Sequence, residues 1–131
     1  MNEHQQALAK TILLVEDDVF ISDIYQMKLR ENGFQLITCE NGLEAVKQLE
    51  GGLVPDLILL DIMMPYMDGL EFLRQKSGKE EWKKIPVILL TNLYQKDQVE
   101  EGLQLGASDY LIKSHFTPAE VLSKVNSLIG E

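Results

Sequence analysis

The sequence predicts a three-layer α/β fold, in which a sheet of five parallel strands lies between two layers of helices. Three uninterrupted apolar runs are typical of strands buried on both faces of such a sheet; they are Thr11–Val15, Leu57–Leu60 and Val87–Leu90. Stretches with the apolar spacing of amphipathic helices separate the strands. This alternation indicates strand–helix–strand units with right-handed crossovers.

The composition is that of one globular domain. The chain has 131 residues, of which 45% are hydrophobic and 25% are charged, and a chain of this length can bury a substantial core. We expect residues 1–10 to form a polar lead-in and residues 11–131 to form the domain. The last predicted helix reaches the end of the chain, so we expect no effector domain after it.

Charge and cysteine usage narrow the classes of function. The net charge of -9 argues against a nucleic-acid or anionic-membrane surface and favours cations and basic protein patches as partners. The single cysteine, Cys39, excludes an internal disulfide and suits a reducing cytoplasm. No apolar run approaches the ~20 residues that a membrane helix needs. We therefore expect a cytoplasmic protein with no membrane insertion.

The first strand leads into a capped helix and then into an edge strand. Asp18 is expected to cap this helix rather than to bind a ligand, and Asn32-Gly33 ends it. The mixed polarity of 34–39 favours an edge strand over a central one. The apolar positions of the helix keep helical spacing; they are Phe20, Ile21, Ile24 and Met27.

Capping residues mark two helices around the central strand. Asn41 begins a helix that Gly51-Gly52 ends, and Asp68 begins a shorter one. A polar loop is expected over 77–84, in which Trp82 is expected to serve for packing.

The last third of the chain holds a weak helix and a strong one. Gly102 lowers the helix propensity of 95–105 by roughly 1 kcal/mol relative to alanine, and this segment is expected to be mobile. A short fifth strand, 110–112, follows it. The final helix begins at 117–120 with a cap, a first-turn proline and a capping-box glutamate.

The most apolar strands are expected at the centre of the sheet, which gives the order 2-1-3-4-5. This is the flavodoxin-like winding, whose ligand crevice lies between the first and third strands at the carboxyl edge. Glu16, Asp17 and Asp61 follow those two strands directly. Three carboxylates gathered there would raise one another's pKa or bind a cation. Mg²⁺ is favoured, because it accepts a few carboxylates and keeps several waters.

Two further polar residues close strands at the same edge. Thr91 follows the fourth strand and Lys113 the fifth. A carboxylate such as Asp61 can attack phosphorus to give an aspartyl phosphate. Lys113 offers a positive charge and Thr91 a hydroxyl donor for phosphoryl oxygens.

Four blocks of the sequence, in order and at fitting spacings, resemble the receiver domain of bacterial two-component response regulators. The resemblance covers about residues 11–129, nearly the whole chain. The blocks are Ile12-Leu13-Leu14-Val15-Glu16-Asp17-Asp18, Leu57-Ile58-Leu59-Leu60-Asp61-Ile62-Met63-Met64-Pro65 with Asp68-Gly69, Pro86-Val87-Ile88-Leu89-Leu90-Thr91, and Gly106-Ala107-Ser108-Asp109-Tyr110-Leu111-Ile112-Lys113.

The resemblance implies a signalling domain that assists its own phosphorylation and dephosphorylation rather than an ordinary enzyme. Asp61 would accept a phosphoryl group from a histidine kinase or a phosphotransfer protein. Mg²⁺, for which Mn²⁺ can substitute, would be bound by Asp17, Asp61 and the Met63 backbone carbonyl, with Glu16 acting mainly through water. An unidentified downstream protein would read the change, without nucleic-acid binding by this domain.

The same resemblance implies a conformational switch. The hydroxyl of Thr91 would turn towards the phosphoryl group, and Tyr110, alternatively an ordinary edge-strand aromatic, would fill the vacated space. With Lys113 also sensing the new charge, the surface of the fourth helix, fifth strand and fifth helix would change. Without an attached effector, the domain would dock on a partner or pass its phosphoryl group to another histidine.

The sequence departs from the family pattern at three places. Ser114 replaces the proline that usually follows the lysine, which leaves the isomer of the Lys113–Ser114 peptide open. Asn92 replaces a small residue beside the threonine and could hinder access to the phosphoryl group. Met63 and Leu93 offer no group to orient an attacking water, so we expect the aspartyl phosphate to hydrolyse slowly.

Three other functions occur on related α/β folds or with a similar site. An aspartate-based phosphatase needs a second aspartate two residues after the nucleophile, where this chain has Met63. A flavin or nucleotide binder needs a phosphate loop after the first strand, where this chain is acidic. A pseudo-receiver, which keeps the fold as an interaction module without being phosphorylated, remains the alternative.

Overall fold

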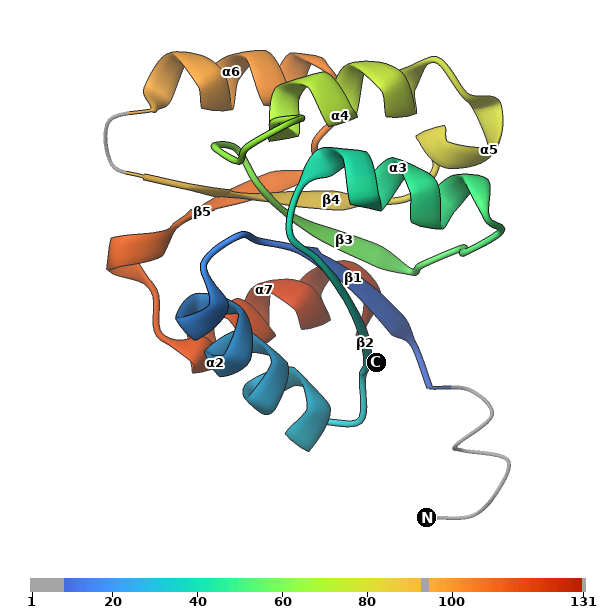
Figure 1. The fold of residues 1–131 in the computed structure, drawn as a ribbon. Coiled ribbons are helices and arrows are strands. Elements are labelled where there is room, and N and C mark those ends of the chain that lie inside the picture. Colours follow the sequence, from blue (N-terminus) through green and yellow to red (C-terminus); the bar gives the residue numbers. More distant parts are fainter. Residues whose placement is uncertain (1–8, 93–94, 131) are drawn as a thin grey trace.

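The computed structural model describes residues 9–92 and 95–130, which form an α/β domain of three layers (Figure 1). Its five strands are all parallel and lie in the order β2-β1-β3-β4-β5. This confirms the predicted winding, with the mixed-polarity strand at one edge. The strands are β1 (Thr11–Val15), β2 (Gln35–Cys39), β3 (Leu57–Asp61), β4 (Val87–Thr91) and β5 (Asp109–Ile112).

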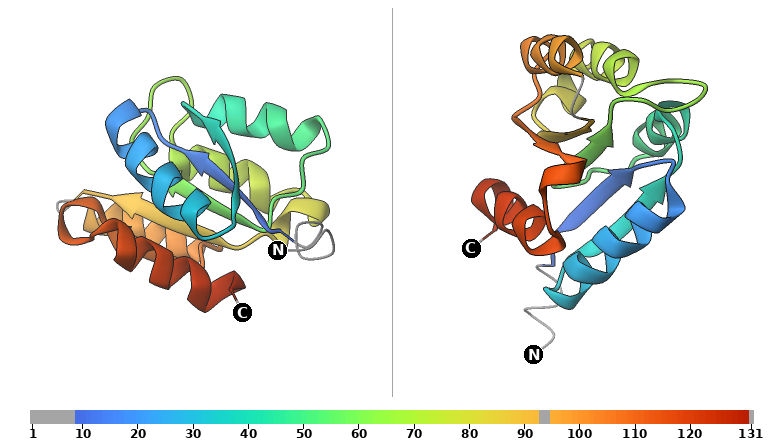
Figure 2. Two further views of the ribbon diagram at one scale, coloured as in Figure 1. Left: turned by 90° about the horizontal axis from the view of Figure 1, so that it is seen from below. Right: turned by 90° about the vertical axis from the view of Figure 1, so that its left-hand side faces the viewer.

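The helices divide between the two faces of the sheet. They are α2 (Val19–Glu31), α3 (Gly42–Glu50), α4 (Gly69–Ser77), α5 (Glu80–Lys83), α6 (Lys96–Gln104) and α7 (Pro118–Ile129), with a 3₁₀ turn η1 (Lys113–His115) before α7. One face carries α2 and α7, and the other carries α3, α4 and α6 (Figures 1 and 2). No helix in the described part of the chain is both long enough and apolar enough to cross a bilayer.

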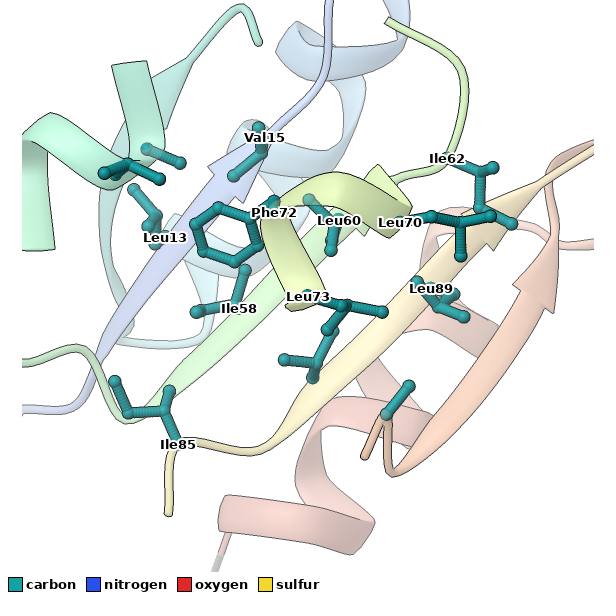
Figure 3. Packing of buried hydrophobic residues seen from close by; sticks show 14 of the residues in the cluster. Leu13, Val15, Ile58, Leu60, Ile62, Leu70, Phe72, Leu73, Ile85 and Leu89 are labelled. Atoms are coloured by element: carbon teal, nitrogen blue, oxygen red, sulfur yellow. The ribbon is translucent and has the colours of Figure 1, made fainter. Parts of the chain in front are cut away.

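Two hydrophobic cores form because successive side chains of a strand point to opposite faces. In β1, Ile12 and Leu14 join the core under α2 and α7, whereas Leu13 and Val15 join the core under the other helices. Figure 3 shows Phe72 of α4 above β1 and β3. Both cores run along the three central strands, so β1, β3 and β4 are buried on both faces as predicted.

The first helix is where it was predicted, but most of its proposed apolar stripe faces outwards. Phe20, Ile24 and Met27 are 82%, 49% and 66% exposed, and of the proposed stripe only Ile21 packs partly against a core. The buried positions are Ser22, Tyr25 and Leu29. Two apolar stripes coexist on this helix, and helical spacing alone does not distinguish them.

The predicted polar loop over 77–84 contains the short helix α5. Trp82 lies within it with only 7% of its surface exposed, and the Lys79 ammonium lies 5.4 Å from its ring centre. The indole therefore packs against the core, as predicted, but in a helical turn. Burial of this large side chain accounts for the helix in a segment too short to be stable alone.

Gly102 has a packing role that helix propensity does not reveal. It is buried in α6, where an added Cβ would lie 2.4 Å from a methyl carbon of Leu89. The glycine thus allows α6 to approach the sheet closely. Its cost in helix propensity is offset by this contact.

The end of β3 is fixed by a close approach of the backbone. Gly69, the first residue of α4, donates its N–H to the Ile62 carbonyl at 2.8 Å. A Cβ at this position would lie 2.4 Å from the backbone oxygen of Asp61. Only glycine therefore lets α4 begin directly beside Asp61.

Replacing Gly69 with alanine should lower the free energy of unfolding by roughly 1–3 kcal/mol, because the new methyl group must displace the backbone at Asp61. Urea denaturation measures the change. Gly78→Ala is the matched control: its φ is -85° and its nearest new contact is 3.5 Å. The control should change stability by less than about 1 kcal/mol. Equal effects at the two positions would contradict the close-approach argument.

Candidate functional site

The register of the sheet brings the strand-end residues to one edge. Val15 pairs with Leu60, so the residues that follow them, Glu16 and Asp61, are neighbours across the boundary between β1 and β3. Asp61 is opposite Leu90 of β4, and Thr91 is opposite Ile112 of β5. The carboxyl edge of the sheet thus carries the polar residues in the predicted arrangement.

Three carboxyl groups form a cluster in the described part of the chain. Glu16, Asp17 and Asp61 each offer an oxygen, and these oxygens lie within 4.8 Å of one another. Glu16 and Asp61 are only 3% and 4% exposed, whereas Asp17 faces solvent. The cluster is therefore anchored in the protein and open on one side.

Lys113 bridges the two buried carboxylates. Its Nζ lies 2.6 Å from Glu16 Oε1 and 3.0 Å from Asp61 Oδ2. Glu16 Oε2 accepts the N–H of Asp18 at 3.1 Å, whereas the buried Oε1 has no partner besides the Lys113 ammonium. One ammonium group thus faces two buried carboxylates with Asp17 nearby, and the site keeps an excess of negative charge.

The pKa values of the bridge follow from this imbalance. Burial, and then the charge of Glu16, raise the pKa of Asp61 from 3.8 to about 8, although Lys113 opposes the change. Burial lowers the pKa of Lys113, but the hydrogen bond to Glu16 and the charge of Asp61 outweigh it, so this pKa is raised. The lysine is firmly charged, and the aspartate lacks sufficient positive charge around it.

The cluster fits a divalent cation. Its donors are carboxylate oxygens, which are the ligands of hard ions such as Mg²⁺ and Mn²⁺, and a single ammonium among three carboxyl groups leaves negative charge unmatched. Since Asp17 is exposed, an ion there would keep part of its water shell. The predicted participation of the Met63 carbonyl stays a prediction; the Met63 side chain is 57% exposed. Asp18 caps α2, as expected, by accepting two backbone N–H groups.

The hydroxyl of Thr91 is buried and is held from the side of α6. Thr91 is 1% exposed, and its Oγ1 donates to Gln95 Oε1 at 2.9 Å. The N–H of Asn92 donates to the same oxygen at 2.7 Å. From the sequence, Gln95 was expected only to begin a helix; a polar residue at such a position carries no signal for a buried contact.

Tyr110 lies on the surface beside Thr91. It is 41% exposed and lines a hollow of about 330 Å³ between α6 and β5. The other lining residues are Thr91, Asn92, Lys96, Val99, Glu100, Leu103 and Ile112. Space therefore exists next to Thr91 into which an aromatic ring could turn.

Tyr25 of α2 is a further neighbour of the site, which no sequence motif indicates. It is 6% exposed. Burial raises the pKa of the Tyr25 hydroxyl. The positive charge of Lys113 opposes this shift in part, and the negative charges of Glu16 and Asp61 add to it. Tyr25 could have been found from the sequence only if the buried face of α2 had been known.

The Lys113–Ser114 peptide, whose isomer the sequence left open, is trans.

Comparisons with known proteins agree on one family. The family model for the response regulator receiver domain matches residues 12–126. The alkaline phosphatase synthesis transcriptional regulatory protein PhoP of Bacillus subtilis (strain 168) is 37% identical over 120 residues, which cover 92% of this chain and 48% of the relative. The chain thus spans about half the length of the curated relatives it matches.

Solved structures indicate the same family, and two of those with a similar fold contain a bound metal ion. The receiver domain of a sensor histidine kinase from Pseudomonas aeruginosa PAO1, described with magnesium coordinated in its active-site cleft, has a TM-score of 0.83 at 32% identity over 94% of this chain and 99% of that one. The manganese-bound response regulator Rcp1 has a TM-score of 0.78 at 33% identity over 90% and 92%.

Replacing Asp61 with asparagine should stabilise the metal-free protein at neutral and alkaline pH. Because the pKa of Asp61 is raised to about 8 on folding, its stabilising contribution is full below its unfolded pKa of about 4 and is lost as the pH rises through 8. Urea unfolding in EDTA between pH 5 and 9 should show the variant gaining roughly 1–3 kcal/mol over the wild type at the upper end.

The exposed Asp23 of α2 provides the matched control. Asp23→Asn should follow the pH dependence of the wild type. If Asp61→Asn also followed it, the carboxylates would not repel each other as the geometry indicates.

Proposed function

Since the chain belongs to the response regulator receiver family, we propose that it accepts a phosphoryl group on Asp61 from the phosphohistidine of a histidine kinase or a phosphotransfer protein. The observation that carries this proposal is the bridge of Lys113 to Asp61 and Glu16 within an open acidic cluster. A nucleophilic carboxylate, a fixed cation and a site for a metal thus lie together.

The transfer needs little besides positioning and charge compensation. A carboxylate oxygen of Asp61 attacks phosphorus, the bond from phosphorus to the histidine nitrogen breaks, and the electron pair returns to the imidazole. Glu16, Asp17, Asp61 and the Met63 carbonyl would hold Mg²⁺ or Mn²⁺, which when bound neutralises charge on the phosphoryl oxygens. Lys113, already 3.0 Å from Asp61, compensates the remaining charge.

The new acyl phosphate is read by residues on β4 and β5. It brings negative charge to a site that already has an excess, so hydrogen-bond donors and cations nearby are drawn towards it. Thr91 turns its hydroxyl to a phosphoryl oxygen, and Tyr110 moves into the hollow beside it. The surface of α6, β5 and α7, which are the fourth helix, fifth strand and fifth helix of the sequence analysis, changes for a downstream protein.

The cellular compartment of the phosphoryl transfer is the next part of the proposal. We place the exchange in the cytoplasm, as expected for a chain whose single cysteine, Cys39, is buried and unpaired. The domain acts as a signalling component, and it assists the formation and hydrolysis of its own acyl phosphate through the groups around Asp61.

Incubation with Mg²⁺ and acetyl phosphate should add one phosphoryl mass to the wild-type protein, as measured by intact mass spectrometry. Asp61→Asn should remove the added mass, because the nucleophile is gone, and EDTA should prevent it. Asp56→Asn, which changes a carboxylate outside the cluster, is the control and should be modified like the wild type. Absence of modification in the wild type would favour the pseudo-receiver.

The aspartyl phosphate should hydrolyse slowly, with a lifetime of minutes or longer. Met63 is exposed beside the site and provides no polar group to orient a water; Leu93, the second residue invoked, lies outside the described residues. Met63→Gln should therefore speed hydrolysis by roughly tenfold, as followed by loss of the phosphoryl mass after removal of acetyl phosphate. Met27→Gln, at an exposed methionine of α2, should leave the rate unchanged. A wild-type half-life of seconds would contradict the prediction.

A further inference from the structure

We propose that Gln95 acts as a latch, which holds the Thr91 hydroxyl in the resting state and so sets how readily a phosphoryl group on Asp61 is sensed. This inference rests on the proposed function and adds a positioning residue to it. Gln95 immediately precedes α6 and is only 8% exposed. Its side-chain oxygen receives two hydrogen bonds from the end of β4.

The direction of the Thr91 proton follows from these contacts. The Asn92 backbone N–H can only donate, so the Gln95 atom 2.7 Å away must be the amide oxygen. Thr91 Oγ1, 2.9 Å from that same oxygen, must therefore donate its proton to be bonded there. The other acceptor near Oγ1 is the Asn92 carbonyl at 3.2 Å.

A hydroxyl has one proton, so Thr91 has to choose between acceptors. While it donates to Gln95, it cannot donate to a phosphoryl oxygen on Asp61. Sensing the phosphoryl group thus requires the bond to Gln95 to break. The hydrogen bond to Gln95 and the hydrogen bond to a phosphoryl oxygen therefore compete for the single hydroxyl proton of Thr91.

The hydrogen bond from Thr91 to Gln95 can break at a limited cost in free energy. When Thr91 leaves, Gln95 Oε1 keeps the N–H of Asn92, so no buried oxygen is left without a partner. One neutral hydrogen bond is exchanged for one to a charged acceptor, which is the stronger kind. Phosphorylation can therefore outcompete the latch.

The latch also connects the site to α6. The Gln95 carbonyl accepts the N–H of Val99 at 2.9 Å, in the first turn of the helix. Release of Thr91 removes one of three hydrogen bonds between Gln95 and the end of β4; the other two are from the Asn92 N–H to Gln95 Oε1 and from the Gln95 N–H to the Asn92 carbonyl. Gln95 is thereby part of the route by which the state of Asp61 reaches the surface of α6 and β5.

The test uses beryllofluoride with Mg²⁺ as the phosphoryl analogue, and binding to the full chain is measured by calorimetry. Gln95→Met keeps the length of the side chain and removes the acceptor. It should lower the apparent dissociation constant about 3- to 10-fold, the equivalent of one neutral hydrogen bond. Gln104→Met, at an exposed position of the same helix, should leave the constant unchanged.

A double-mutant cycle separates the latch from a general effect on α6. In a Thr91→Val background the hydroxyl is absent, so Gln95→Met should no longer change the affinity. An equal gain in both backgrounds would overturn the latch. Gln95→Asn, which keeps the amide but shortens its reach, gives the same test if the methionine variant does not fold.

The two proposals fail in different ways. If the wild-type protein does not bind beryllofluoride with Mg²⁺, the proposed function is wrong and the latch is wrong with it. If the wild type binds and Gln95→Met binds equally well, only the latch is overturned. In the resting protein, hydrogen exchange at the Asn92 amide should be faster in Gln95→Met; unchanged protection would also overturn the latch.

Discussion

The chemistry of this domain depends on an unequal count of charges in a buried space. Two carboxylates with almost no exposure share a single ammonium, and a third carboxylate lies at the opening. Removing charged groups from water is costly unless their charges are matched. The domain leaves part of that cost unmet at Asp61, so the site favours a bound cation.

The fold keeps this arrangement in place through its backbone rather than through the charged groups themselves. Parallel register fixes which residues leave the sheet side by side, and the packed strands below cannot adjust without disturbing both cores. Gly69 adds a second restraint from α4. Because the acidic groups repel one another, a rigid frame of this kind is needed to hold them together in the absence of a cation.

Much of the fold and most of the site could be predicted from the sequence, since each depends on local signals. Uninterrupted apolar strands gave the sheet order, and the residue that follows each strand identified Asp61, Glu16 and Lys113. Interactions set by packing were not accessible in this way. Two apolar stripes on α2 fit the same spacing, Trp82 lies in a helix of one turn, and the partner of Thr91 is a glutamine without a distinctive context.

Gln95 illustrates why such partners escape sequence reasoning. Its role comes from the position of the start of α6 beside the end of β4, where the Gln95 side chain meets the Thr91 hydroxyl. A glutamine at another start of a helix would be an ordinary solvated side chain. The residue types at a site can be found from strand ends, but the competing hydrogen bonds that tune it depend on tertiary contacts.

The position of Trp82 determines what optical methods can detect. It is the only tryptophan of the chain and lies in α5, just before β4 begins, whereas the acidic cluster lies where strands end. The sheet therefore separates the indole from the site along the length of a strand. The intrinsic fluorescence of Trp82 will report on unfolding. An emission signal for events at Asp61 requires a fluorophore introduced near the carboxyl ends of the strands.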